Sequence, residues 1–235
     1  MCLKFANVLG RYVLGHACGL AFFLTPQLSR SPIYVEVLER VKKGHTLMDI
    51  GTFLGHDLRR LVYDGAPSDN LFGVDIVNFY DLGYEFFRDR EHFKGQFIEA
   101  NFLSTDSSEL AALRERKASV IVISQVLHQW GWDDQLKATE ALVAFTQPGT
   151  MIVGNMVGND KAQEVSLPSI PTPAWRHNAD SFAQLFQEVG GATGTVWETK
   201  VWPKTLGDMG WNNTKDTYFT EDGCNLIDFM AKRIK

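Results

Sequence analysis

The stretch TLMDIGTFLGHDLRRLVYDGAPSDNLFGVDI, which runs from Thr46 to Ile76, decides the fold. It opens with a short apolar run that is interrupted by Asp49, and it then passes through a turn that contains Gly51 and Gly55. The residues after the turn, HDLRRLVYD, carry leucine and valine at helical spacing. This order of features predicts a strand, a glycine turn and a helix.

A second short apolar run, Leu71 to Val74, follows a cluster of turn-forming residues and ends in Asp75. This acid lies roughly 20 residues beyond the glycine turn, as it does in nucleotide-binding β-α-β units. A carboxylate at the end of a strand can accept two hydrogen bonds from a ribose diol, and glycines let a ligand approach the backbone closely. The stretch therefore predicts a nucleoside site.

The spacing of the glycines limits the class of ligand that the turn can bind. It is G-x-x-x-G and not the G-x-G-x-x-G of dinucleotide-binding folds. The helix also carries an acid, Asp57, as its second residue, which disfavours a pyrophosphate at the helix N-terminus. A ligand that contains adenosine but no phosphate fits better, and a β-α-β unit without any ligand is the alternative.

Length and composition limit the class of protein. A chain of 235 residues, 45% of them hydrophobic, indicates a single α/β domain with an appendage and a large core. The net charge of -5 and the lack of a dense Lys/Arg run argue against nucleic acid as a partner. Cys2, Cys18 and Cys224 have neither metal-ligand spacing nor a disulfide pattern, so we expect no metal and a cytoplasmic location.

The N-terminal residues are expected to form a separate element. Met1 to Leu28 has the pattern of one or two apolar helices before a break, which predicts an N-terminal helical cap over 1–32 and a main domain over 33–235. Its most apolar stretch, Tyr12 to Leu24, is too short for a membrane span of about 20 residues, and a signal-peptide cleavage site is hard to place. We expect this helix to pack over the ligand site or against a second subunit, in a homodimer.

The rest of the chain alternates between helical and strand patterns. The patterns predict helices over 32–44, 79–93, 107–117, 133–145 and 181–190, and strands over 96–100, 118–124, 150–157, 194–201 and 226–234. The β-branched run Ala118 to Ser124 is typical of a central parallel strand that helices cover on both faces. Residues 157–173 are polar and rich in proline, which predicts a long loop or a lid.

The acid before the glycine turn and the acid after the second strand resemble the first two motifs of class I S-adenosylmethionine-dependent methyltransferases. The resemblance implies S-adenosyl-L-methionine as cofactor. It also implies a doubly wound, Rossmann-like α/β fold, in which a seven-stranded, mostly parallel sheet ends in an antiparallel C-terminal hairpin. The cofactor contacts that it implies are Asp49, Gly51, Thr52, Gly55, Asp75, Ile76, Asn101, Phe102, Ser124 and Gln125.

Several phrases are similar to a narrower family, the fungal methyltransferases of polyketide, terpenoid and meroterpenoid pathways. The phrases lie between Ile33 and Glu198, and they are the stretch from Asp49 to Ile76, LGYEFFRD, SQVLHQWGWDDQ, PGTMIVGNMVGN, WRHNADSF and TGTVWE. The similarity implies O-methylation of a carboxyl or hydroxyl group on a hydrophobic intermediate of secondary metabolism, with carboxyl favoured.

Two residues depart from the pattern of this family. His56 stands where the family has glutamine, and Asn101 stands where it has aspartate, both at places that contact the cofactor. The asparagine carbonyl can still accept a hydrogen bond, but without charge assistance. These departures leave open a cyclase or isomerase that does not consume the cofactor, and a non-catalytic regulator that binds partner proteins.

Three residues are candidates for catalysis. Ligands of doubly wound sheets lie beyond the carboxyl ends of the strands, so His128, after the central strand, is the first candidate for the base that a hydroxyl acceptor requires. It could equally bond a backbone carbonyl. Arg176 and His177 follow the proline-rich segment, where the guanidinium could hold a substrate carboxylate or pair with a structural acid such as Asp180.

Overall fold

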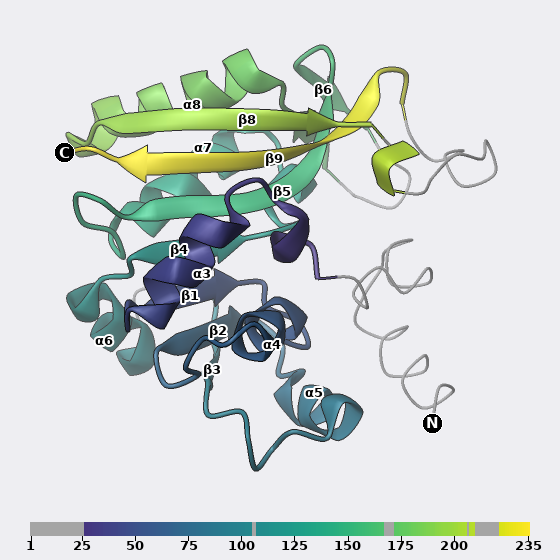
Figure 1. Ribbon diagram of the computed structural model, residues 1–235. Coiled ribbons are helices and arrows are strands. Elements are labelled where there is room, and N and C mark those ends of the chain that lie inside the picture. Colours follow the sequence, from purple (N-terminus) through teal and green to yellow (C-terminus); the bar gives the residue numbers. More distant parts are fainter. Residues whose placement is uncertain (1–25, 105–106, 167–171, 206, 210–220) are drawn as a thin grey trace.

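The computed structural model describes residues 26–104, 107–166, 172–205, 207–209 and 221–235. The strands of its main sheet are β1 (Leu47–Ile50), β2 (Leu71–Asp75), β3 (Gln96–Glu99), β4 (Val120–Ile123), β5 (Met151–Asn159), β8 (Trp197–Lys204) and β9 (Cys224–Arg233). They form a seven-stranded sheet in the order β3-β2-β1-β4-β5-β9-β8 (Figure 1). β1 to β5 are parallel, and β9 is antiparallel to both β5 and β8. The predicted mostly parallel sheet with an antiparallel C-terminal hairpin is confirmed.

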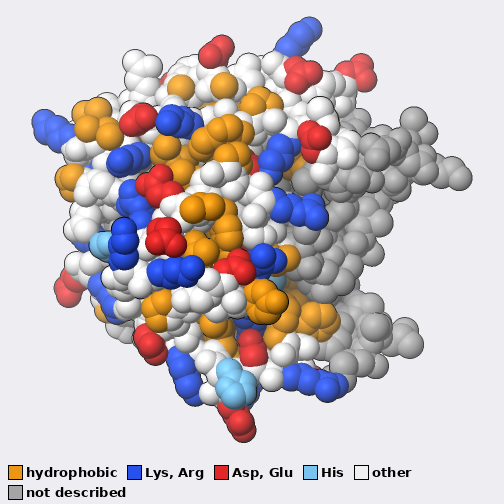
Figure 2. All heavy atoms as spheres, viewed as in Figure 1, with side chains coloured by type: hydrophobic (Ala, Val, Ile, Leu, Met, Phe, Trp, Pro, Cys, Tyr) orange, Lys and Arg blue, Asp and Glu red, His pale blue; other side chains and the backbone are white. Residues whose placement is uncertain are grey.

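Helices cover both faces of this sheet. They are α3 (Tyr34–Lys42), α4 (His56–Tyr63), α5 (Tyr80–Phe87), α6 (Ser108–Arg116), α7 (Trp132–Val143) and α8 (Ala179–Thr193), with short 3-10 turns η2 (Leu28–Arg30), η3 (Leu127–Gln129) and η4 (Gly207–Met209). α3 and α4 pack in one cluster of buried side chains, whereas α6, α7 and α8 pack in the other. Figure 2 shows acidic, basic and hydrophobic side chains interspersed on the side that carries α3.

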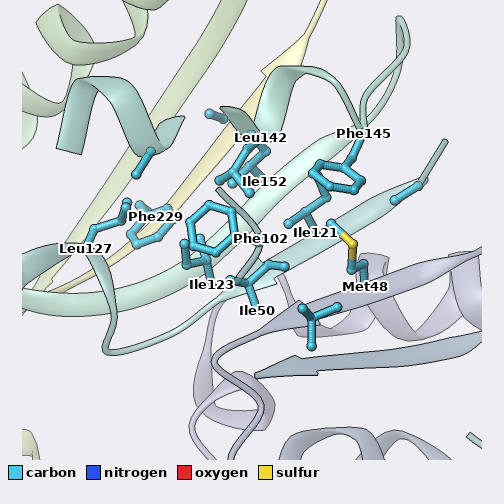
Figure 3. Close-up of a cluster of buried hydrophobic side chains, with 14 of the residues drawn as sticks. Met48, Ile50, Phe102, Ile121, Ile123, Leu127, Leu142, Phe145, Ile152 and Phe229 are labelled. Atoms are coloured by element: carbon cyan, nitrogen blue, oxygen red, sulfur yellow. The ribbon is translucent and has the colours of Figure 1, made fainter. Parts of the chain in front are cut away.

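The alternation of residues along β1 explains the two clusters. Leu47 packs with α3 and α4, whereas Met48 and Ile50 pack in the cluster on the opposite face. Figure 3 shows this second cluster, in which side chains from β1, β4 and β5 meet side chains from α7 and β9. Asp49 therefore points to the same face as Leu47, and only 5% of this acidic residue is exposed.

Two predictions of local structure were wrong. The segment 157–173 was expected to be a loop, but β5 continues to Asn159 and β6 (Gln163–Val165) pairs antiparallel with β7 (Ala174–Arg176). The helix expected to end at Gly190 continues to Thr193. Gly190 lies inside the helix and does not end it. A Cβ at this position would lie 2.6 Å from the carbonyl oxygen of Thr195, so the glycine permits close packing there.

Some predictions concern residues outside the described part of the chain. The structure does not describe residues 1–25, which are most of the expected N-terminal cap, or residues 167–171, which are part of the expected lid. The subunit contact expected of the N-terminal helix also lies outside the described residues. The first described helical residues are those of η2, directly before α3. Of the helices that the structure describes, none has the length and apolar composition that crossing a bilayer requires.

Candidate functional site

The carboxyl ends of β1, β2 and β4 meet at one edge of the sheet. Ile50 is in register with Val74 on one side and with Ile123 on the other, because the three strands are parallel neighbours. The residues that follow these positions are therefore brought together, namely Gly51, Asp75 and Ser124. This edge is where doubly wound sheets bind their ligands.

Asp75 presents an oriented carboxylate at this edge. Its Oδ2 accepts the backbone N–H of Phe53 at 2.9 Å, and its Oδ1 accepts the backbone N–H of Val77 at 3.3 Å. Burial raises the pKa of Asp75, and these N–H donors lower it in part. Within the described residues it forms no ion pair, and each oxygen retains a lone pair for a further donor.

The glycine turn lies beside this carboxylate. Gly51 is exposed and has a φ of 72°, and a Cβ at this position would lie 2.5 Å from Cγ2 of Val126. One side of the turn is therefore packed against protein atoms, while its backbone remains open to solvent. Phe53, which donates to Asp75, has a φ of 50°, a conformation that non-glycine residues adopt mainly where the surroundings impose it.

A second acid, Asp49, is buried below the turn. Burial, together with the negative charges of Asp57 and Asp75, raises the pKa of Asp49 well above its usual range. The hydroxyl of Thr52 is close enough to lower this pKa in part, but its Oγ1 is buried and makes no hydrogen bond of acceptable geometry. The edge of the sheet therefore holds a carboxyl group whose ionisation a nearby cation would favour.

The acid at the start of α4 is engaged within the protein. Asp57 does not face a ligand, because its Oδ1 accepts the backbone N–H of Leu28 at 3.1 Å and the residue is buried. His56 begins the helix with its Nε2 3.8 Å from Oδ2 of Asp57. Gly55, with a φ of 70°, forms the N-cap, and a Cβ there would lie 3.1 Å from the ring of Phe97.

The ends of β2 and β3 carry exposed apolar side chains. Ile76 is 66% exposed, and Leu103, which the sequence reasoning did not select, is 44% exposed. Between them along the chain, Asn101 is exposed and its Oδ1 accepts the backbone N–H of Leu103 at 3.1 Å. Phe102 differs from the other predicted contacts, because its side chain is buried in the core cluster of Figure 3.

The residues after β4 form a tightly held loop. Gln125 has a φ of 59°, and its backbone N–H and its Nε2 donate to the backbone and side-chain oxygens of Asn155, each at 2.8 Å. The side chain of Gln125 is thus engaged within the protein. The neighbouring Ser124 has a buried Oγ that lacks a hydrogen-bond partner among the described residues. Sequence reasoning missed Asn155, which lies on the next strand and has no motif of its own.

His128 and Arg176 are brought together. Arg176 is 3% exposed, and it donates through Nη1 to the backbone oxygen of His128 at 2.6 Å and through Nε to Oε1 of Glu221 at 3.2 Å. The acid that pairs with Arg176 is therefore Glu221, and not Asp180. Burial and the charge of Arg176 lower the pKa of His128 to about 3, and its enclosed Nδ1 has no partner in the described chain.

His177 is placed differently. It is fully buried, with Nε2 3.0 Å from Oε1 of Gln135 and Nδ1 2.9 Å from Oγ of Ser181. The amide nitrogen of Gln135 donates to the backbone oxygens of Trp130 and Trp175, so its oxygen accepts from Nε2 of His177. Burial lowers the pKa of His177 to about 4, and this neutral imidazole joins α7 to α8 inside the protein.

Comparison with known proteins identifies the family. No family model matches the chain. The chain is 38% identical over 187 residues to the O-methyltransferase phiE of a fungal species, an alignment that covers 78% of this chain and 62% of phiE. It is 34% identical over 195 residues to the methyltransferase adrK of Penicillium rubens, covering 81% of this chain and 70% of adrK. The chain belongs to this family of fungal methyltransferases.

Solved structures agree with the fold of this methyltransferase family. The N1-methyltransferase of 1,6-didemethyltoxoflavin from Burkholderia thailandensis matches with a TM-score of 0.61 at 12% identity, covering 99% of this chain and 90% of that chain. The [4+2]-cyclase SpnF matches with a TM-score of 0.60 at 12% identity, covering 84% of this chain and 79% of that chain. The fold alone therefore does not separate methyl transfer from cyclisation, whereas the fungal relatives are named methyltransferases.

Proposed function

We propose that this protein is an S-adenosylmethionine-dependent O-methyltransferase that acts on a carboxyl, or else a hydroxyl, group of a hydrophobic fungal secondary metabolite. Membership of the fungal family supports the reaction, although the chain spans 62% of the length of phiE. The observation that carries the proposal is the Asp75 carboxylate, which two backbone N–H groups orient beside the exposed backbone of Gly51. This arrangement fits a nucleoside without phosphate.

The residues at the edge fit the parts of this cofactor. Asp75 would hold the ribose hydroxyls, and the exposed apolar side chains of Ile76 and Leu103 would flank the adenine ring. Asp49 and the unpartnered hydroxyl of Thr52 would face the methionine portion, whose positive charges favour an ionised carboxylate. When bound, the cofactor supplies a methyl group that is already activated by a positively charged sulfur.

The surroundings of His128 favour a carboxyl acceptor. A carboxylate is already ionised at neutral pH, whereas a phenol or alcohol requires a base whose pKa lies near the working pH. Burial and Arg176 lower the pKa of His128 to about 3, which makes this imidazole a weak base. Arg176 donates to the backbone of His128, but its charge is paired with Glu221, so the preference for a carboxylate depends on the weak basicity of His128. His177 has no part in the proposal, because both its ring nitrogens are engaged in the core.

A methyl-transfer assay tests this function. The protein is incubated with S-adenosylmethionine that carries a labelled methyl group and with a panel of hydrophobic aromatic and terpenoid acids. The methyl esters of the same acids and the matched phenols serve as controls. We expect label in the ester products of some acids and none with the pre-formed esters. Failure of the protein to bind S-adenosylhomocysteine in calorimetry would refute the proposal, and a product of unchanged mass without cofactor consumption would indicate a cyclase or isomerase.

We also propose that the protein is a homodimer and that it is located in the cytoplasm. The apolar residues Tyr12 to Leu24 support a homodimer formed through the N-terminal helix, and the absence of a disulfide pattern supports a cytoplasmic location. Light scattering of the full chain and of a variant with Phe22 and Phe23 changed to serine tests the dimer. An unchanged molar mass at the monomer value in both would contradict it.

A further inference from the structure

Arg59 of α4 lies behind the glycine turn and bonds its backbone. Nη1 of Arg59 donates to the carbonyl oxygen of Leu54 at 2.5 Å and, more weakly, to that of Gly55 at 3.4 Å. Leu54 directly follows Phe53, whose N–H orients the Asp75 carboxylate. The Arg59 side chain, only 8% exposed, therefore fixes the Leu54–Gly55 peptide, the second peptide after the one whose N–H orients Asp75.

The other side of the same guanidinium is bound by Asp89. Nε and Nη2 of Arg59 donate to the two carboxylate oxygens at 2.6 and 3.1 Å, which is a bidentate pair. Asp89 lies just beyond the end of α5, and α5 follows the segment that begins at Asp75. Arg59 thus joins the glycine turn to the far end of the helix that carries the chain away from the site.

Aromatic rings enclose this ion pair. The guanidinium carbon lies 4.7 Å from the ring centroid of Phe87, 4.8 Å from that of Phe93 and 5.2 Å from that of Tyr84. A planar guanidinium can stack on such rings and form a fork with a carboxylate at the same time, whereas an ammonium group cannot. α5 packs closely against the turn, because a Cβ at Gly83 of α5 would lie 2.7 Å from the carbonyl oxygen of Leu54.

We propose that Arg59 is a positioning residue for cofactor binding, which holds the glycine turn in the shape that aims Asp75 at the ribose without touching the cofactor itself. The inference rests on the proposed function for the identity of the cofactor. The residues that carry it are the two carbonyl groups of the turn, the Asp89 carboxylate and the three rings. The left-handed conformation of Phe53 is a strained one, so we infer that it persists because the Arg59 bond fixes the carbonyl group of the next residue, Leu54.

The test compares Arg59→Lys with a control variant that disturbs the core and not the turn. Leu61→Ala on the same helix removes a fully buried side chain from the core below α4 and leaves the turn untouched. We expect Arg59→Lys to weaken S-adenosylhomocysteine binding at least tenfold in calorimetry, and Leu61→Ala to bind within twofold of the parent protein, even if it melts at a lower temperature. Amide exchange of the peptide that contains Phe53 should accelerate in Arg59→Lys and stay unchanged in Leu61→Ala.

The outcomes separate this inference from the proposed function. If the parent protein does not bind S-adenosylhomocysteine, the proposed function fails, but amide exchange still reports whether Arg59 shapes the turn. If the parent binds and Arg59→Lys binds within twofold of it, the inference is overturned. Asp89→Asn keeps the guanidinium and weakens only its bidentate pair with residue 89. This variant replaces Arg59→Lys in the test if Arg59→Lys does not fold. Unchanged affinity for S-adenosylhomocysteine in Asp89→Asn overturns the inference as well.

Discussion

Asp75→Asn tests the part of the site on which the methyl-donor proposal depends. The native carboxylate uses one lone pair of each oxygen on a backbone N–H and offers the remaining ones to the two ribose hydroxyls. An asparagine has a single oxygen, which will keep the shorter bond, the one to the N–H of Phe53. Its amide nitrogen will then face the N–H of Val77, so one acceptor for the ribose is replaced by a donor.

The size of the effect follows from this loss. The variant loses one hydrogen bond to a charged group and the charge assistance of the other, which together are worth about 2–4 kcal/mol. This corresponds to binding that is weaker by about 30- to 700-fold. The fold should be retained, because Asp75 forms no ion pair within the described residues and asparagine keeps the same shape.

Calorimetric titration with S-adenosylhomocysteine measures the change, and Glu198→Gln is the matched control. Glu198 is an exposed acid on β8, at the opposite edge of the sheet from β3, and its replacement alters the net charge by the same amount. We expect the control to bind as the parent protein does. An Asp75→Asn variant that melts within about 3 °C of the parent and binds within twofold of it would refute the assignment of the ribose site.

Three further predictions concern neighbouring residues. Asp49→Asn should raise the melting temperature by about 2–4 °C at neutral pH while it weakens cofactor binding, because a raised pKa means that the folded state resists ionising this group. Scanning calorimetry should show the parent losing stability relative to the variant as pH rises through the raised pKa of Asp49. A variant that is less stable than the parent at neutral pH would contradict this prediction. Gly51→Ala should lower the free energy of unfolding by about 1–2 kcal/mol because of its φ of 72°, and by more because of the overlap with Val126. Denaturant unfolding should show that adding Val126→Ala restores only part of this free energy. An unchanged free energy of unfolding in Gly51→Ala would show that the turn has another conformation. His128→Gln should lower kcat on an acid substrate by less than about tenfold in steady-state assays, because a carboxylate needs no base, whereas a loss of about 100-fold or more would indicate general-base catalysis.

The sequence predicted those features that local patterns determine. The strand, glycine turn and helix from Thr46 onward follow from hydrophobic periodicity and glycine placement, and Asp75 follows from its position at the end of a strand. The partners of the site residues could not be predicted, because they lie far apart in the chain. Gln125 and Asn155 are separated by 30 positions, and Arg176 and Glu221 by 45. The pairing of β6 with β7 was missed for a different reason, because neither three-residue strand has a pattern of its own.

The position of β9 also bears on how the protein is made. This last strand of the described chain lies between β5 and β8 and pairs with both along most of its length. A ribosome must therefore release residues 224–233 before one side of the sheet can close, and until then β5 presents an unpaired apolar edge. Loss of these ten residues would leave β8 without a neighbour, so a chain shortened at this end should aggregate during synthesis and not accumulate as a weakened enzyme.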